Sequence, residues 1–306
     1  MKALTNNRLI SIIGPTGIGK TALSIALAKH FNTEIISADS RQFYTEMQIG
    51  TAVPEPAELA AAPHHFIQHK SIHSAYSVGD YERDALALLN VLFTDKNPLI
   101  LVGGSGLYVA AVEKGLDKFP SIDPSIRQTL KERISTEGIL PLQAQLKALD
   151  PQTYSQIDLE NPQRLIRALE VCIGSGQPYS SFLKKDKTIR NFKTIKIGLT
   201  ASREIIYDRI NLRVDQMIAS GLVEEARDLY PFKSLNALQT VGYRELFRYF
   251  DGELSLDMAV EEIKKNTRRF AKRQLTWYRK DPEVHWFAYD SPLTNIIQAT
   301  EAALAM

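Results

Sequence analysis

The chain has 306 residues, of which 44% are hydrophobic and 24% charged, and its formal net charge is +2. This length suits one large α/β domain with an inserted or appended subdomain, and the composition is ordinary for a globular protein. No apolar run approaches the roughly 18 to 20 residues of a membrane span, so we expect a cytoplasmic protein, and the single cysteine, Cys172, excludes an internal disulfide and a cysteine zinc site.

Apolar runs alternate with helical patterns along most of the chain, which predicts an α/β fold with a mostly parallel sheet flanked by helices. The predicted strands are 9–13, 34–38, 99–102 and 195–200. Residues 119–190 break this rhythm, because they carry helical patterns separated by Pro and Gly. We therefore expect a core of residues 1–118 and 191–306 with a helical insertion domain at 119–190. The predicted helices are 125–135, 139–148 and 162–173 in the insertion, and 203–219, 222–230, 242–250 and 256–280 in the core.

A complete phosphate-binding loop with the pattern G-x-x-x-x-G-K-T follows the first strand. Its residues are Gly14, Pro15, Thr16, Gly17, Ile18, Gly19, Lys20 and Thr21. The glycines let the backbone approach an anion, and the start of the next helix favours negative charge. Lys20 is placed to reach phosphate oxygens and the Thr21 hydroxyl to bind Mg²⁺. This pattern predicts a core like that of P-loop NTPases, with a site for a phosphate chain and magnesium.

Polar or glycine-rich residues follow two further strands. Asp39 comes directly after strand 34–38, at the sheet edge where ligands collect in open α/β folds. It either acts on Mg²⁺, accepts a proton, or merely caps the next turn. The run Gly103-Gly104-Ser105-Gly106 follows strand 99–102 and indicates close approach of the backbone to a ligand, although glycines at strand ends are common.

Two later helices carry polar residues on one side. Gln163, Arg164 and Arg167 are three and four residues apart on a helix that opens with a good Asn-Pro start signal. Arg209 and Arg213 lie one turn apart, and they form either an anion clamp or ordinary ion pairs.

Four histidines, His64, His65, His69 and His73, invite a metal interpretation. A histidine-containing loop or surface is the stronger one, because no carboxylate falls within the run.

The final predicted helix concentrates positive charge. Eight basic residues and no acid lie between positions 264 and 280, and they fall within one half of a helical wheel. Ile263, Phe270 and Trp277 fall on the other half, so we expect them to pack on the protein. The positive stripe then faces a polyanion, with Lys272 and Arg273 among its contacts.

Taken in order, the motifs of the chain resemble the tRNA dimethylallyltransferase family from residue 9 to about 286. They are residues 14–21, 37–42, 50–52, 63–65, 101–108 (LVGGSGLY), 163–170 (QRLIRALE), 241–244 (VGYR) and 267–277 (TRRFAKRQLTW). The resemblance implies transfer of a dimethylallyl group from dimethylallyl diphosphate to N6 of adenosine 37, in the anticodon stem-loop of tRNAs that read codons beginning with U. It also implies that the phosphate loop holds diphosphate rather than ATP.

The resemblance further implies roles for single residues. Lys20, Thr21, Asp39 and Arg213 are the expected catalytic residues: Asp39 takes the N6 proton, Thr21 binds Mg²⁺, and Arg213 contacts the diphosphate. Phe43 or Tyr44 is a candidate wedge beside the extruded base. The implied tRNA contacts are Asp39, Ser40, Arg41, Gln42, Ser105, Arg127, Gln163, Arg164, Leu165, Ile166, Arg167, Gln239, Thr240, Val241, Gly242, Tyr243 and Arg244. Nothing in the sequence requires more than a monomer.

Three alternatives compete with this interpretation. A P-loop kinase of a nucleotide or small metabolite would use Asp39 as base, but a small substrate needs no basic stripe. A regulatory GTPase lacks support, because the guanine-specific N/T-K-x-D element is absent. A non-enzymatic tRNA-binding module would not need Lys20, Thr21 and Asp39.

Overall fold

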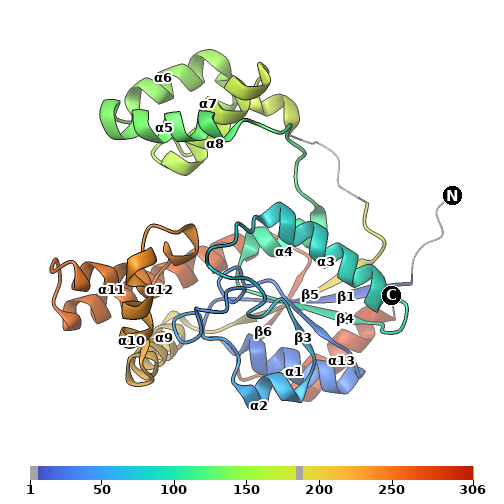
Figure 1. Ribbon diagram of the computed structural model, residues 1–306. Helices are drawn as coiled ribbons and strands as arrows, with labels where there is room; N and C mark the ends of the chain where they lie inside the picture. Colours follow the sequence, from blue (N-terminus) through green and yellow to red (C-terminus); the bar gives the residue numbers. More distant parts are fainter. Residues whose placement is uncertain (1–5, 184–188, 306) are drawn as a thin grey trace. The chain divides into compact units, whose positions relative to one another are not determined.

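The computed structural model describes residues 6–183 and 189–305, which divide into two compact units (Figure 1). Unit 1 comprises Met1–Lys114 and Ile189–Met306, and unit 2 comprises Gly115–Thr188. The sequence predicts the insertion at 119–190, and part of that range, 184–188, lies outside the described residues.

In the described part of unit 1, six strands form one sheet in the order β3-β2-β4-β1-β5-β6, and every neighbouring pair is parallel. This confirms the predicted α/β fold. The strands are β1 (Arg8–Ile13), β2 (Ile35–Ser37), β3 (His64–His65), β4 (Leu99–Val102), β5 (Lys193–Thr200) and β6 (Val284–Ala288). Strands β3 and β6 were not predicted, because β3 has only two residues and β6 is a partly exposed edge strand without a continuous apolar run.

Helices cover both faces of this sheet (Figure 1). Alternate residues of a strand point to opposite faces, so Leu9 packs in a different hydrophobic cluster from Ile10. The helices of unit 1 are α1 (Lys20–Phe31), α2 (Pro56–Ala61), α3 (Val78–Leu92), α4 (Gly106–Lys114), α9 (Arg203–Ala219), α10 (Leu222–Leu229), α11 (Tyr243–Phe250), α12 (Leu256–Tyr278) and α13 (Leu293–Leu304). Among the described helices, none has the length and apolarity that a bilayer span requires.

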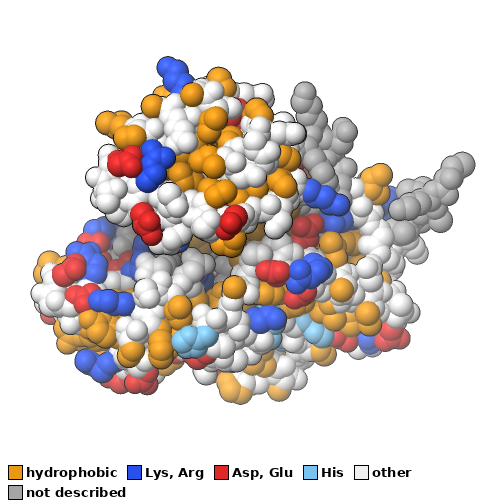
Figure 2. Space-filling model, turned by 45° about the horizontal axis from the view of Figure 1, so that its top comes forward, with side chains coloured by type: hydrophobic (Ala, Val, Ile, Leu, Met, Phe, Trp, Pro, Cys, Tyr) orange, Lys and Arg blue, Asp and Glu red, His pale blue; other side chains and the backbone are white. Residues whose placement is uncertain are grey.

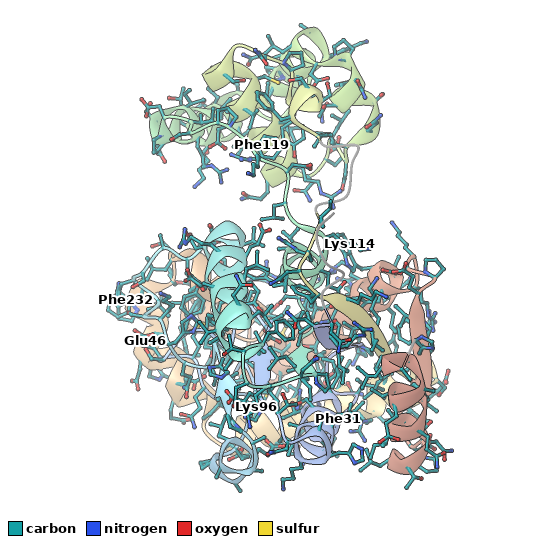
Figure 3. All side chains as sticks on the ribbon, turned by 90° about the vertical axis from the view of Figure 1, so that its right-hand side faces the viewer. Phe31, Glu46, Lys96, Lys114, Phe119 and Phe232 are labelled. Carbon is teal, nitrogen blue, oxygen red and sulfur yellow. The ribbon has the colours of Figure 1, made fainter. Side chains whose placement is uncertain are left out.

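Unit 2 consists of helices around its own small core. They are α5 (Pro124–Glu137), α6 (Leu140–Leu149), α7 (Pro151–Gln156) and α8 (Pro162–Ser175). Leu130, Leu146 and Leu169 are buried in this core, while Phe119, labelled in Figure 3, stacks on Tyr179 at 4.9 Å between ring centroids. Helix α8 begins as predicted, since the Asn161 side chain accepts hydrogen bonds from the amides of residues 163 and 164. The six-residue α7 was missed because it is too short to show a helical period.

Charged side chains of both signs are mixed with apolar ones over the face drawn in Figure 2, as the small net charge leads one to expect. One charged cluster centres on a buried lysine. The Lys196 ammonium, on β5, donates to Asp281 and Glu283, both at 2.8 Å, and Lys114 at the end of α4 (Figure 3) donates to Asp281 at 3.0 Å. Burial raises the pKa of Asp281, but the two lysines outweigh this effect and lower it to about 2. The pairs therefore fasten the end of α12 to the sheet.

We expect Asp281→Asn to lower the free energy of unfolding by about 2 kcal/mol at pH 7, because the carboxyl pKa lies below its usual value only in the folded state. That contribution is complete above about pH 5 and is lost as the pH falls toward 2, since the unfolded state takes up its proton first. Urea unfolding of the wild type and the variant at several pH values measures it. A difference that stays constant between pH 7 and pH 3 would contradict the assignment.

Candidate active site

The phosphate loop connects β1 to α1 in the conformation that its glycines allow. Gly17 and Gly19 have φ angles of +77° and +109°, in the left-handed region that glycine favours. Gly14 lies so close to β5 that a Cβ there would come within 2.7 Å of the Leu199 carbonyl oxygen. The amide-bearing turn thus needs glycine at these positions, and it opens directly onto the N-terminus of α1.

Two cations lie across this loop. Lys20 Nζ donates to the Pro15 carbonyl at 2.8 Å, and Arg209 Nε donates to the Gly17 carbonyl at 2.7 Å. Burial lowers the pKa of Lys20 to about 8; the Asp39 carboxylate opposes this shift and the Arg213 guanidinium adds to it. The Lys20 ammonium is therefore buried beside the loop, with a second cation, Arg209, on the same stretch of backbone.

Arg213, one turn after Arg209 on α9, lies close to the same loop. Its guanidinium makes no hydrogen bond or ion pair with the described residues. Burial lowers the pKa of Arg213, as does Arg209, while Asp39 and Glu58 oppose the shift. Neither arginine has an acidic partner within salt-bridge distance in the described chain, so the geometry favours an anion clamp over ordinary ion pairs.

Asp39 lies between these cations, at the carboxyl end of β2. One carboxylate oxygen, Oδ1, accepts the Arg41 amide at 3.1 Å, so the residue does cap its turn. Its other oxygen, Oδ2, accepts no hydrogen bond from the residues the structure describes. Capping and proton acceptance are therefore compatible, because they use different oxygens.

A side chain that the sequence did not single out, Gln274, joins the two glycine-rich loops. Its Oε1 accepts the Thr16 amide at 2.9 Å, and its Nε2 donates to the Gly104 carbonyl at 2.9 Å. The residue is buried on α12, and a Cβ at Gly104 would come within 2.4 Å of Nε2. The helical periodicity of the sequence could have indicated a buried position for Gln274, because it shares a helix face with the buried residues Ile263 and Tyr278.

A second unpredicted residue, Glu225 on α10, shapes the loop after β2. Its carboxylate accepts the amides of residues 48, 49 and 50 at 3.0, 2.7 and 2.9 Å, and the Tyr243 hydroxyl at 2.7 Å. A Cβ at Gly50 would lie 2.6 Å from the Tyr243 ring. Tyr243, which the sequence placed among the tRNA contacts, is fully buried here and supports the loop from behind.

Two adjoining cavities meet at Asp39. The first, the phosphate cavity, has a volume of about 390 Å³ and is lined by the phosphate loop, Thr21, Arg209 and Arg213. The second, the apolar cavity, has a volume of about 440 Å³ and runs to the exposed side of α12. Seven residues line both: Thr16, Asp39, Thr51, Ala52, Gly104, Arg213 and Met217. A ligand in each cavity would therefore meet its neighbour beside the Asp39 carboxylate.

The predicted RNA contacts near Asp39 also hold the site together. The Ser40 amide donates to Ser105 Oγ at 3.1 Å, and Arg41 Nη1 donates to the Ala237 carbonyl at 2.9 Å. Gln42 Nε2 donates to the Ala52 carbonyl at 2.8 Å. Ser40, Arg41 and Ser105 line the apolar cavity, whereas Gln42 lines the phosphate cavity.

Three consecutive residues before α11 border the site. Thr240, Val241 and Gly242 line the apolar cavity. Gln239 is turned to the Lys233 carbonyl, to which its Nε2 donates at 2.6 Å, and Arg244 is exposed.

Several predicted RNA contacts in unit 2 have structural roles. Arg127 donates to the buried Glu170 at 3.0 Å, and Arg167 lies 3.5 Å from the same carboxylate. Leu165 and Ile166 are buried in the core of unit 2, so their side chains are not available to a nucleic acid. Gln163 and Arg164 are exposed, and their contact with RNA stays a prediction.

One interpretation from the sequence changes at this point. Phe43 and Tyr44 are buried in the core of unit 1, so their rings cannot lie beside an extruded base and the wedge hypothesis for them is wrong. His65 pairs with Glu34 at 2.7 Å, and no group of three or more His, Cys, Asp or Glu in the described chain is arranged to hold a metal.

Helix α12 differs from its prediction in the face that it buries. Ile263, Ala271, Gln274 and Tyr278 are buried, whereas Phe270 and Trp277 are exposed. Lys264 is paired with Asp215 of α9, and Lys265 with Glu262, which lies one turn before it on the same helix and outside the stretch 264–280. The exposed cations are Arg269, Lys272, Arg273, Arg279 and Lys280.

The donor groups at the loop suit magnesium. The Thr21 hydroxyl and the Asp39 carboxylate both line the phosphate cavity. Mg²⁺ prefers oxygen ligands, takes only one or two from protein, and completes its shell with phosphates and water. These residues fit an ion that is bound mainly through a phosphorylated substrate.

Comparison with known proteins gives a consistent result. The family described as IPP transferase matches residues 42–281. A tRNA dimethylallyltransferase of Christiangramia forsetii is 61% identical over 299 residues, which cover 98% of this chain and 99% of the relative. One of Flavobacterium psychrophilum is 58% identical over 298 residues, with 95% and 97% covered.

Solved structures are similar as well. The full-length tRNA isopentenylpyrophosphate transferase of Bacillus halodurans has a TM-score of 0.72 and 37% identity over 97% of both chains. A eukaryotic dimethylallyltransferase acting on tRNA has a TM-score of 0.78 at 24% identity, over 98% of this chain and 78% of that one, and shares the fold.

Gln274→Met removes both hydrogen bonds between the glycine-rich loops at nearly constant side-chain size and leaves the Thr16 amide unpaired. We expect a loss of about 2 kcal/mol in the free energy of unfolding and about tenfold weaker binding of inorganic pyrophosphate. Urea unfolding and calorimetry measure the two effects. Thr276→Ala, at an exposed position of the same helix, is the control and should change neither. Unchanged pyrophosphate affinity in Gln274→Met would remove the positioning role.

Proposed function

Because this chain belongs to the tRNA dimethylallyltransferase family, we propose that it transfers the dimethylallyl group of dimethylallyl diphosphate to N6 of adenosine 37 in tRNAs that read codons beginning with U. The observation that carries the proposal is the meeting of two unlike cavities at Asp39. One is built for a short phosphate chain, and the other for an apolar or aromatic group. A transfer between a diphosphate ester and a purine base needs this combination.

The phosphate cavity supports the departure of diphosphate. In the reaction a bond forms between adenine N6 and the allylic carbon, while the carbon–oxygen bond to diphosphate breaks and its electron pair leaves with the oxygen. Lys20, Arg213 and the loop amides are fixed near the place where this negative charge grows. Preorganised charge of this kind is usually the largest contribution to catalysis. A magnesium ion held through Thr21 would add positive charge at the same place.

The apolar cavity supports the other half of the reaction. Adenine N6 is a weak nucleophile, because its lone pair is delocalised into the ring, so its proton must leave as the new bond forms. Asp39 is the carboxylate at the junction, and its Oδ2 is available to take that proton. Ile210, Val214 and Met217 of α9 line the cavity close to Arg213. They keep water away from an electrophilic allylic carbon, which water would otherwise capture.

Asp39→Asn keeps an oxygen for the Arg41 amide but removes the base. We expect prenyl transfer to slow by about 10²–10⁴-fold, while binding of an anticodon stem-loop changes little. Single-turnover rates with radiolabelled dimethylallyl diphosphate and filter binding of the RNA measure the two effects. Asp290→Asn, an exposed acid outside both cavities, is the control. A variant of Asp39 that turns over like the wild type would exclude it as the base.

The choice of donor separates this proposal from a P-loop kinase. With an unmodified tRNA that carries adenosines at positions 36, 37 and 38, we expect dimethylallyl diphosphate to give an N6-modified adenosine 37, detected by mass spectrometry of nucleosides. ATP should give no phosphorylated product. In the proposed complex a base of the RNA occupies the apolar cavity, so no hydroxyl group that could accept a phosphoryl group lies beside Asp39. Phosphorylation from ATP without prenyl transfer would overturn the proposed function.

A further inference from the structure

The rim of the apolar cavity carries exposed apolar side chains where a solvated surface would be expected. Phe270 and Trp277 on α12 are 38% and 46% exposed, and Leu107 on α4 is 50% exposed. All three line the cavity. Neither aromatic ring belongs to a hydrophobic cluster of the described chain, and neither packs on another aromatic ring there. Their packing within the protein therefore does not account for them.

The two rings have a regular geometry. They are seven residues apart, which brings them to the same side of the helix, about 10 Å apart along its axis. Trp277 rests against Gly106, since a Cβ there would come within 2.6 Å of the indole. The Arg273 guanidinium lies between the two positions, 5.8 Å from the centroid of the Phe270 ring. This spacing is too long for one base to contact both rings and leaves room for one base on each.

The surrounding charge indicates the kind of ligand. Arg269, Lys272, Arg273, Arg279 and Lys280 are exposed around these rings, and no acidic side chain of the described residues pairs with them. Rings interleaved with unpaired cations suit single-stranded nucleic acid, whose bases stack while its phosphates are neutralised. An apolar protein partner would not require five unpaired cations.

We propose that Phe270 and Trp277 form a stacking platform for the two unpaired bases that flank the adenosine entering the apolar cavity. The inference rests on the proposed function. Extrusion of one base deprives both of its neighbours of a stacking partner, and the two exposed rings of α12 replace it. The platform thus stabilises the opened loop in the conformation that reaction requires, independently of the phosphate contacts.

A thermodynamic cycle with full-length protein tests the platform. The RNAs are an anticodon stem-loop and two copies in which the nucleotide 5′ or 3′ of the target adenosine is abasic. We expect Phe270→Ala to weaken binding of the intact stem-loop about tenfold, and one of the two abasic sites to weaken binding to wild-type protein by a similar factor. When Phe270→Ala is combined with that abasic RNA, binding should be no weaker than with either change alone, because each change removes the same stacking contact. If the effect of Phe270→Ala on affinity multiplied with the effect of the abasic site for both abasic RNAs, the platform would be overturned.

Salt dependence separates stacking from charge. Phe270→Ala should weaken binding by the same factor at every salt concentration, whereas Lys272→Ala should reduce the slope of log affinity against log salt by about 0.7 to 0.9. Phe270→Tyr should restore affinity, since it retains the ring. Met258→Ala, at a 56% exposed position of the same helix outside both cavities, is the matched control. A Phe270→Tyr variant as weak as Phe270→Ala would count against stacking.

The same samples report on the proposed function separately. Wild-type protein should prenylate the intact stem-loop, and failure to do so contradicts the proposed function itself. Prenylation by the wild type together with an affinity of Phe270→Ala equal to that of Met258→Ala contradicts the platform alone.

Discussion

The active site depends on a buried amide side chain that joins its two glycine-rich loops and so helps to fix the distance between them. Gln274 accepts from the phosphate loop with its oxygen and donates to the second glycine-rich loop with its nitrogen. Neither a carboxylate nor an ammonium can do both, because the first has no donor and the second no acceptor. With this distance fixed, Thr16, Asp39 and Gly104 border both cavities, and two different ligands can share one reacting centre.

The electrostatics of the site follow from the same compactness. Lys20, Arg209 and Arg213 line the phosphate cavity together with the acids Asp39, Glu55 and Glu58, but none of the three cations lies within salt-bridge distance of an acid in the described chain. The buried Lys196, by contrast, is matched by Asp281 and Glu283. An unmatched cluster is costly to bury, so it marks a position where a ligand supplies the missing charge. All three cations line the phosphate cavity, whereas the lining of the cavity on the other side of Asp39 is mainly apolar.

Local patterns in the sequence were sufficient for the phosphate loop, Asp39 and four of the strands, because short-range spacing determines each of them. Contacts between distant residues were not accessible in this way. Gln274 meets Thr16 across 258 positions of sequence, and Glu225 meets Gly50 across 175. Helical periodicity gave the stripe on α12 but not which face packs, so Phe270 and Trp277 were placed on the wrong side. Arg127 meets Glu170 across 43 positions of sequence, whereas Arg167 lies three residues before the same carboxylate on one helix.

Glu225 holds the loop after β2 through the loop's backbone. Its carboxylate accepts three consecutive main-chain amides, and the side chains at positions 48 and 49 take no part in these bonds. The Ile49 side chain packs against the core of unit 1, whereas Gln48 is exposed. Gly50 has no room for a side chain, because any β-carbon would collide with the tyrosine ring behind it. Three neighbouring positions of one loop thus differ in how far the fold restricts their side chains, while a single acidic residue on another helix holds the backbone that joins them.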